Sequence, residues 1–250
     1  MRRFIVMTML VTCLAGLPAQ DVTVPPTASP EEPVAVPQVI PPPPQSGNTP
    51  SAIKADALLP YKQGRDLDAL GKKNEAVIKY QEAIVICDRE IAQDPTRMDS
   101  YTVKCWCLFR LERYRQVVDV GLVSLKIKFD ARVVEVMGEA FYYLADDANA
   151  IKYLQRYIDN VGEFGDRVPS AYFFMAESYL RQKRYDHADI AYSFAVYREA
   201  NIARWWFRYA SVVEILGEYQ RAYDLYAKAL KLSPGLKEAS DGMARVKAKI

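Results

Sequence analysis

From residue 57 onward, apolar side chains recur with the 3.6-residue period of an α-helix, and the period persists to the end of the chain. The last stripe shows it most simply. Ala239, Met243, Val246 and Ile250 would share one side of a helix over residues 236–250, with lysines on the other side. Short connections containing Gly, Pro or Asp separate the stripes. The pattern predicts an all-α domain of helices joined by turns.

A fixed offset of 34 residues relates the stretch from Pro169 to Leu236 to itself. At this offset alanines fall on alanines and tyrosines on tyrosines. The matched pairs are Ala176 with Ala210, Tyr185 with Tyr219, Ala188 with Ala222, Tyr192 with Tyr226, and Ala195 with Ala229. The period, with its small and aromatic positions, resembles that of the tetratricopeptide-repeat (TPR) family, whose unit is a pair of antiparallel helices.

The resemblance implies a right-handed superhelical array of about five TPR helix-turn-helix pairs, closed by a C-terminal capping helix. The match is strong in the fifth repeat, good in the first, whose second helix looks long, and weak in the second and third. A basic helix lying on a membrane is the alternative for the last segment, although that segment lacks an aromatic anchor. The predicted TPR domain covers residues 52–250, with repeats at about 57–97, 98–130, 131–168, 169–202 and 203–236 and the capping helix at 237–250.

Residues 1–20 have the three parts of an export signal. Arg2 and Arg3 precede an apolar core, Phe4 to Val11, which is too short to span a bilayer, and a cleavage site could follow Ala19. An uncleaved anchor is the alternative. Within export, Leu10 to Cys13 resembles the lipobox of bacterial lipoproteins, which makes Cys13 a lipidation candidate, although Thr12 departs from that motif. We therefore expect an exported protein of the periplasm or cell envelope, either released after cleavage or anchored by lipid.

Residues 21–51 form a proline-rich segment with no apolar periodicity. Eleven of the fifteen prolines precede residue 51, and Pro41 to Pro44 are consecutive. Such composition favours extended polyproline II and buries little surface. We predict a disordered linker, which serves either as a spacer between an anchor and the repeats or as a tail without function.

Charge and residue usage argue against several kinds of site. The net charge of +2 does not indicate a nucleic-acid partner. One histidine, His187, and four cysteines give neither a metal cluster nor a nucleophile with its base, so we expect no metal, no cofactor and no enzymatic activity. Cys105 and Cys107 lie on opposite sides of a helix, and pairing of Cys87 with one of them remains open.

The TPR resemblance also suggests which side chains face a partner. In that family the second, fifth, ninth and twelfth places of each first helix line a groove. Here these places hold Tyr61, Arg65, Asp68, Thr102, Trp106, Phe109, Glu135, Glu139, Tyr142, Phe173, Glu177, Arg204, Phe207, Ser211 and Glu214. Aromatic side chains ringed by charges suit a protein or peptide ligand, although aromatics at helical spacing are commonly part of a core.

These features predict a non-catalytic scaffold of the cell envelope that binds a protein or peptide in its groove. The alternative is a structural subunit of a larger envelope complex or a homo-oligomer, whose groove is filled by its own chain. The only membrane contact expected is through an N-terminal lipid anchor.

Overall fold

The structure is a computed structural model of the 250-residue chain, and it describes residues 56–250. The predicted signal, the lipidation candidate Cys13 and the linker over residues 21–51 lie outside the described residues. Among the residues that are described, no helix is long and apolar enough to cross a bilayer.

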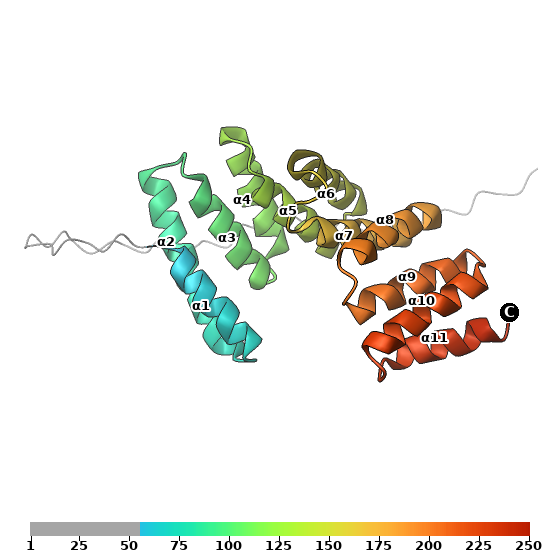
Figure 1. The fold of residues 1–250 in the computed structure, drawn as a ribbon. Helices are drawn as coiled ribbons and strands as arrows, with labels where there is room; N and C mark the ends of the chain where they lie inside the picture. The colour runs from blue at the N-terminus through green and yellow to red at the C-terminus, as the bar shows by residue number, and fades with distance from the viewer. Residues whose placement is uncertain (1–55) are drawn as a thin grey trace, which may run out of the picture. The chain divides into compact units, whose positions relative to one another are not determined.

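Residues 56–250 form eleven α-helices and no strand, which confirms the all-α prediction. The helices form antiparallel pairs that pack on one another in chain order (Figure 1). Their bounds are α1 Leu58–Ala69, α2 Lys73–Gln93, α3 Met98–Arg110, α4 Tyr114–Ile127, α5 Ala131–Tyr143, α6 Asp147–Val161, α7 Val168–Arg181, α8 Tyr185–Arg198, α9 Ala203–Ile215, α10 Tyr219–Leu232 and α11 Lys237–Lys247.

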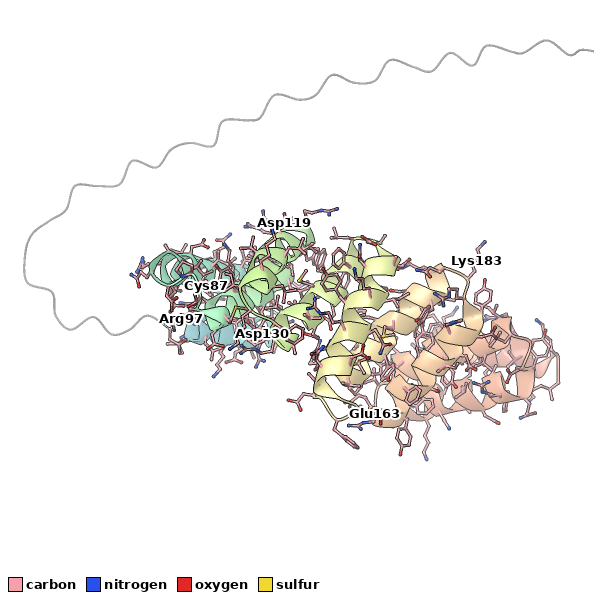
Figure 2. All side chains as sticks on the ribbon, turned by 90° about the horizontal axis from the view of Figure 1, so that it is seen from above. Cys87, Arg97, Asp119, Asp130, Glu163 and Lys183 are labelled. Atoms are coloured by element: carbon pink, nitrogen blue, oxygen red, sulfur yellow. The ribbon has the colours of Figure 1, made fainter. Side chains whose placement is uncertain are left out.

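The turn between the two helices of each pair has the same construction five times. One residue takes a positive φ of 58° to 81°, and the amides of that residue and the next donate to carbonyls of the preceding helix, as in the fifth repeat, where Glu218 N donates to Val213 O at 3.2 Å. The five residues are Gly71, Glu112, Ala145, Lys183 and Gly217. In Figure 2 the turn at Lys183 lies on one edge, and the connections between pairs, marked by Arg97, Asp130 and Glu163, lie along the opposite edge.

Packing within the pairs depends on small residues facing large ones. A Cβ atom on Gly64 would lie 2.6 Å from Cε1 of Tyr80, and one on Gly138 would lie 2.7 Å from Leu154, so no side chain fits at either place. Tyr80 and its counterparts Tyr192 and Tyr226 are among the largest fully buried side chains of residues 56–250. Each cluster of buried side chains spans adjacent pairs, which gives the continuous core of a solenoid.

The second repeat, whose sequence match is weak, is completed by its neighbour. Gly121 stands where an aromatic residue is expected, and Met137 of α5 fills the space, since a Cβ on Gly121 would lie 2.3 Å from the Met137 sulfur. Cys105 and Cys107 enter different clusters on opposite sides of α3. Together with Cys87 they are buried free thiols, and burial raises the pKa of both Cys87 and Cys105 to about 12.

The end of the capping helix differs from the sequence-based expectation. Ile250 follows the end of α11 and is 63% exposed, so its assignment to the buried stripe of the capping helix is wrong, whereas Ala239 and Val246 are buried. Trp205 of α9 is half-buried. Its ring stacks on Phe173 of α7, with 4.8 Å between the ring centroids. Among neighbouring first helices, α7 and α9 are the least closely packed, which leaves space for a large side chain between them.

Candidate functional site

The predicted groove residues lie on the first helices α1, α3, α5, α7 and α9, whose shared surface we call the inner face. Their exposure varies widely. Tyr61, Glu135, Glu139, Glu177 and Thr102 are buried, and Arg65 and Arg204 are exposed. The partly buried members are Asp68, Trp106, Phe109, Tyr142, Phe173, Phe207, Ser211 and Glu214.

Two adjoining hollows open on the first three repeats of the inner face. The central pocket, about 200 Å³, is lined by Trp106, Phe109, Arg132, Glu135, Val136, Glu139, Tyr157 and Arg167. The end pocket, about 360 Å³, is lined by Asp56, Ala57, Leu58, Glu90, Arg97, Asp99, Ser100, Val103, Trp106 and Arg132. Because Trp106 and Arg132 line both hollows, the two pockets form one linked site.

Trp106 is positioned by aromatic packing. Its ring stacks on Tyr61 of α1, with the centroids 5.4 Å apart, and it packs against the buried clusters on either side of α3. Offset stacking of this kind stabilises a pair by roughly 1 kcal/mol beyond the burial of its area. The indole is therefore held in place while part of it faces both pockets.

Arg167 holds two buried carboxylates in the central pocket. Glu135 and Glu139 lie one turn apart on α5. Arg167 Nε donates to Glu135 Oε1 at 3.0 Å, and its Nη2 donates to Glu139 Oε1 at 2.6 Å. Burial, together with the neighbouring Glu135, raises the pKa of Glu139 well above its ordinary value, even though Arg167 opposes this. One guanidinium thus serves two acids, and Glu139 holds a proton more readily than an isolated carboxyl group does.

Arg132, between the two pockets, also binds two carboxylates. Its Nη2 atom donates to Asp99 Oδ1 at 2.8 Å and to Asp130 Oδ2 at 2.6 Å, and its Nε donates to Asp130 Oδ1 at 3.0 Å. Asp130 also accepts from the backbone amide of Arg132 and so caps α5. The guanidinium is fixed by carboxylates on both sides.

Glu90 brings an incompletely paired carboxylate to the end pocket. It lies in the last turn of the long helix α2, and the residue is only 8% exposed. Oε2 accepts a hydrogen bond of 2.6 Å from Ser100, but Oε1 has no hydrogen-bond donor. Arg97 Nη2 lies 3.4 Å from Oε1 without the alignment of a hydrogen bond. A buried acceptor left in this state favours a donor that enters the pocket.

In the fourth and fifth repeats, the acids of the inner face have complete sets of partners. Arg208 donates to both oxygens of Glu177, each at 2.6 Å, and the buried Tyr192 hydroxyl donates to the same carboxylate. Glu214 repeats the arrangement with Arg245 at 3.0 Å and 3.1 Å and with the Tyr226 hydroxyl at 2.7 Å.

The pKa of Glu214 reflects this pairing. Burial alone would raise it, but the hydrogen bonds from Arg245 and Tyr226 hold the pKa below its ordinary value. This shift is opposite in direction to that of Glu139, although both carboxyls belong to the inner face.

The remaining predicted groove residues mostly contact other parts of the chain. Phe173 packs against Trp205, Ser211 Oγ donates to Phe207 O at 2.9 Å, and the Arg181 guanidinium lies 4.0 Å from the centre of the Tyr142 ring. The exposed Arg204 lies 3.8 Å from Glu238 of α11. Of the predicted residues, the central pocket gathers Trp106, Phe109, Glu135 and Glu139. That these side chains contact a partner stays a prediction.

Sequence reasoning missed Glu90, Arg132 and Arg167. Arg132 occupies the second place of the third repeat, so the rule that selected Arg204 would have found it. Arg167 lies in the connection between α6 and α7, where no periodicity assigns a direction, and Glu90 lies in the extra length of α2. Among residues 56–250, no group of three or more His, Cys, Asp or Glu side chains could hold a metal ion.

Comparison with solved structures identifies the fold. YrrB, a TPR protein described as having an unusual peptide-binding site, matches with a TM-score of 0.52 at 16% identity, over 74% of this chain and 91% of its own. The MamA RS-1 ArsTM double mutant matches with a TM-score of 0.59 at 14% identity, over 73% and 96%.

TTC0263, a thermophilic TPR protein of Thermus thermophilus, matches with a TM-score of 0.53 at 17% identity, over 77% of this chain and 100% of its own. No protein-family model and no curated protein matches the sequence. The likeness is therefore one of structure, and residues 56–250 have the fold of a TPR protein.

Proposed function

We propose that this protein is a non-catalytic interaction scaffold that binds a protein or peptide segment on its inner face. The observation that carries the proposal is the pair of linked pockets around Trp106, in which a partly exposed indole stands among three buried glutamates and three arginines. Interfaces concentrate binding energy in such aromatic anchors. The peptide-binding site ascribed to YrrB, which shares the fold, is consistent with this proposal.

The proposed location is the cell envelope. It rests on the signal-like residues 1–20 and on the proline-rich segment that would separate an anchor from the repeats. Lipidation at Cys13 is one form of this proposal, and cleavage near Ala19 is the other. Mass spectrometry of the mature N-terminus distinguishes them, because a lipidated Cys13 and a free Gln20 start differ in mass. A retained Met1 would contradict both.

The binding test compares two tryptophans of similar burial. Trp106 faces the pockets, whereas Trp206 lies between α8 and α10, where its Nε1 donates to Ala200 O at 2.8 Å. We expect Trp106→Ala to lose the partners that the wild type recovers from an envelope extract, and Trp206→Ala to keep them. Thermal melting confirms beforehand that both variants are folded. Equal recovery by the two variants would remove the pockets from the proposed function.

A second candidate function, assembly through the outer face, is favoured by the apolar side chains that the second helices expose. Ile78 and Val85 on α2 and Phe194 and Tyr197 on α8 are 43% to 82% exposed. Exposed apolar groups in this number can form an interface between subunits. Light scattering after size exclusion tests this directly. A stable oligomer that Tyr197→Lys dissociates would favour assembly, and a monomer at all concentrations would exclude self-assembly.

A further inference from the structure

Carboxylates outnumber cations around the two linked pockets. Five acidic residues line the two pockets, Asp56, Glu90, Asp99, Glu135 and Glu139. A sixth, Asp130, binds Arg132. The two pockets are lined by only three cationic side chains, those of Arg97, Arg132 and Arg167. The chain as a whole has a net charge of +2. The two linked pockets therefore hold an excess of carboxylates in a slightly basic protein.

Two of the three guanidinium groups already bind carboxylates. Arg167 spans Glu135 and Glu139, and Arg132 spans Asp99 and Asp130. Arg97 lies against Glu90. An acidic segment would lie beside the buried carboxylates of Glu90, Glu135 and Glu139, and like charges brought together at an interface repel each other. Charge complementarity favours a cation instead.

The carboxylates offer acceptors on both sides of Trp106. In the end pocket, Glu90 Oε1 is buried and lacks a hydrogen-bond donor. In the central pocket, two buried carboxylates share one guanidinium. A Lys or Arg side chain could lay its aliphatic stem on the indole and extend its charged end to either acceptor, and tryptophan is the aromatic ring that attracts cations most strongly.

We propose that the ligand of these pockets is a peptide segment carrying two basic side chains, one received by Glu90 in the end pocket and the other by Glu135 and Glu139 in the central pocket. The inference rests on the proposed function and specifies the chemical class of its partner. Arg132, fixed between the pockets by Asp99 and Asp130, would separate the two cationic ends.

Selection from a random 12-residue peptide library on the purified full-length chain tests the inference. We expect enrichment of peptides with two basic residues. The strongest peptide is then synthesised, and its dissociation constant is measured with the wild type, Glu90→Gln and Glu135→Gln. Loss of one charge-assisted hydrogen bond should weaken binding roughly tenfold in each variant. Replacing either basic residue of the peptide by norleucine should have the same effect. This second test does not alter the protein, so it remains valid even if a Glu→Gln variant folds poorly.

The matched control is Asp119→Asn, which removes the same charge from an exposed place on α4, opposite Arg97 and Asp130 in Figure 2. It should bind like the wild type. The inference would be overturned if the selected peptides had no excess of basic residues. It would also be overturned if both Glu→Gln variants and the norleucine peptides bound as tightly as the originals. In either case the scaffold function would stand. A selection that yields no binding peptide would instead contradict the proposed function itself.

Discussion

Glu139 and Glu177 occupy the ninth place of successive repeats, and both are almost fully buried, at 4% and 6% exposure. Their surroundings nevertheless differ. Glu177 has a guanidinium bound to both oxygens and a tyrosine hydroxyl as a further donor, whereas Glu139 shares the guanidinium of Arg167 with Glu135. The fourth repeat uses its acid to hold the structure together, whereas the third repeat has two carboxyl groups for one guanidinium beside a pocket. The place of a residue in a repeat shows which way it faces, but its partners determine what it can do.

The largest effect should come from removing Glu177. Glu177→Ala leaves Arg208 and the Tyr192 hydroxyl without their acceptor in a partly buried place, so we expect a loss of about 3 kcal/mol in the free energy of unfolding. Urea denaturation at pH 7 measures it. A loss below about 1 kcal/mol, close to the ordinary effect of a surface change, would mean that the cluster contributes little.

Glu139→Gln should instead increase the free energy of unfolding. The folded protein holds the Glu139 proton more tightly than the unfolded chain, whose pKa is near 4.5, so the stability present below that pH is lost as the pH rises through the raised pKa. Glutamine does not titrate, and the variant should be more stable than the wild type at pH 7 by about 1 kcal/mol, the ordinary size of a single-residue effect. Urea denaturation at pH 4 and at pH 7 should show the difference only at the higher pH. A destabilised variant at pH 7 would mean that Glu139 is held as Glu177 is.

Ser178 sharpens the comparison, because its hydroxyl is buried without a partner and faces the core rather than a pocket. Ser178→Ala removes an unsatisfied group and replaces it by the best helix former, so we expect a gain of about 1 kcal/mol. Thermal unfolding monitored by circular dichroism measures the change. An equal loss would show that the hydroxyl is hydrogen-bonded in solution.

The smallest effect concerns the turns. Ala145 and Lys183 have a positive φ that costs a residue with a Cβ about 1 kcal/mol, so Ala145→Gly and Lys183→Gly should each stabilise the fold by roughly 0.5 to 1 kcal/mol. Gly217→Ala, at the equivalent place in the fifth repeat, should destabilise by a similar amount. Parallel melting curves test the three variants, and the same sign in all of them would contradict this explanation.

The sequence predicted the architecture wherever small and aromatic residues stand at their expected places, as Gly64 does against Tyr80. The weak second repeat was harder to recognise, because Met137, a residue of the next repeat, supplies the missing bulk over Gly121. The position rule also selected Trp106 and the buried Glu135, Glu139 and Glu177. It could not find Arg167, because a connection has no period, nor predict that Glu139 and Glu177 would be paired so differently, because their partners lie about thirty residues away.

The position of Trp106 has a consequence for the stability of the first helix pair. Its indole is one of the contacts between the first helix pair and α3, through Tyr61 of α1, and part of it also faces the pockets. In a stack whose members touch only their neighbours, the outermost pair frays most easily. A molecule bound against this ring would therefore stabilise the outermost pair. We expect the amide hydrogens of α1 and α2 to exchange more slowly once the pockets are filled, although these helices lie far along the chain from the glutamates of α5.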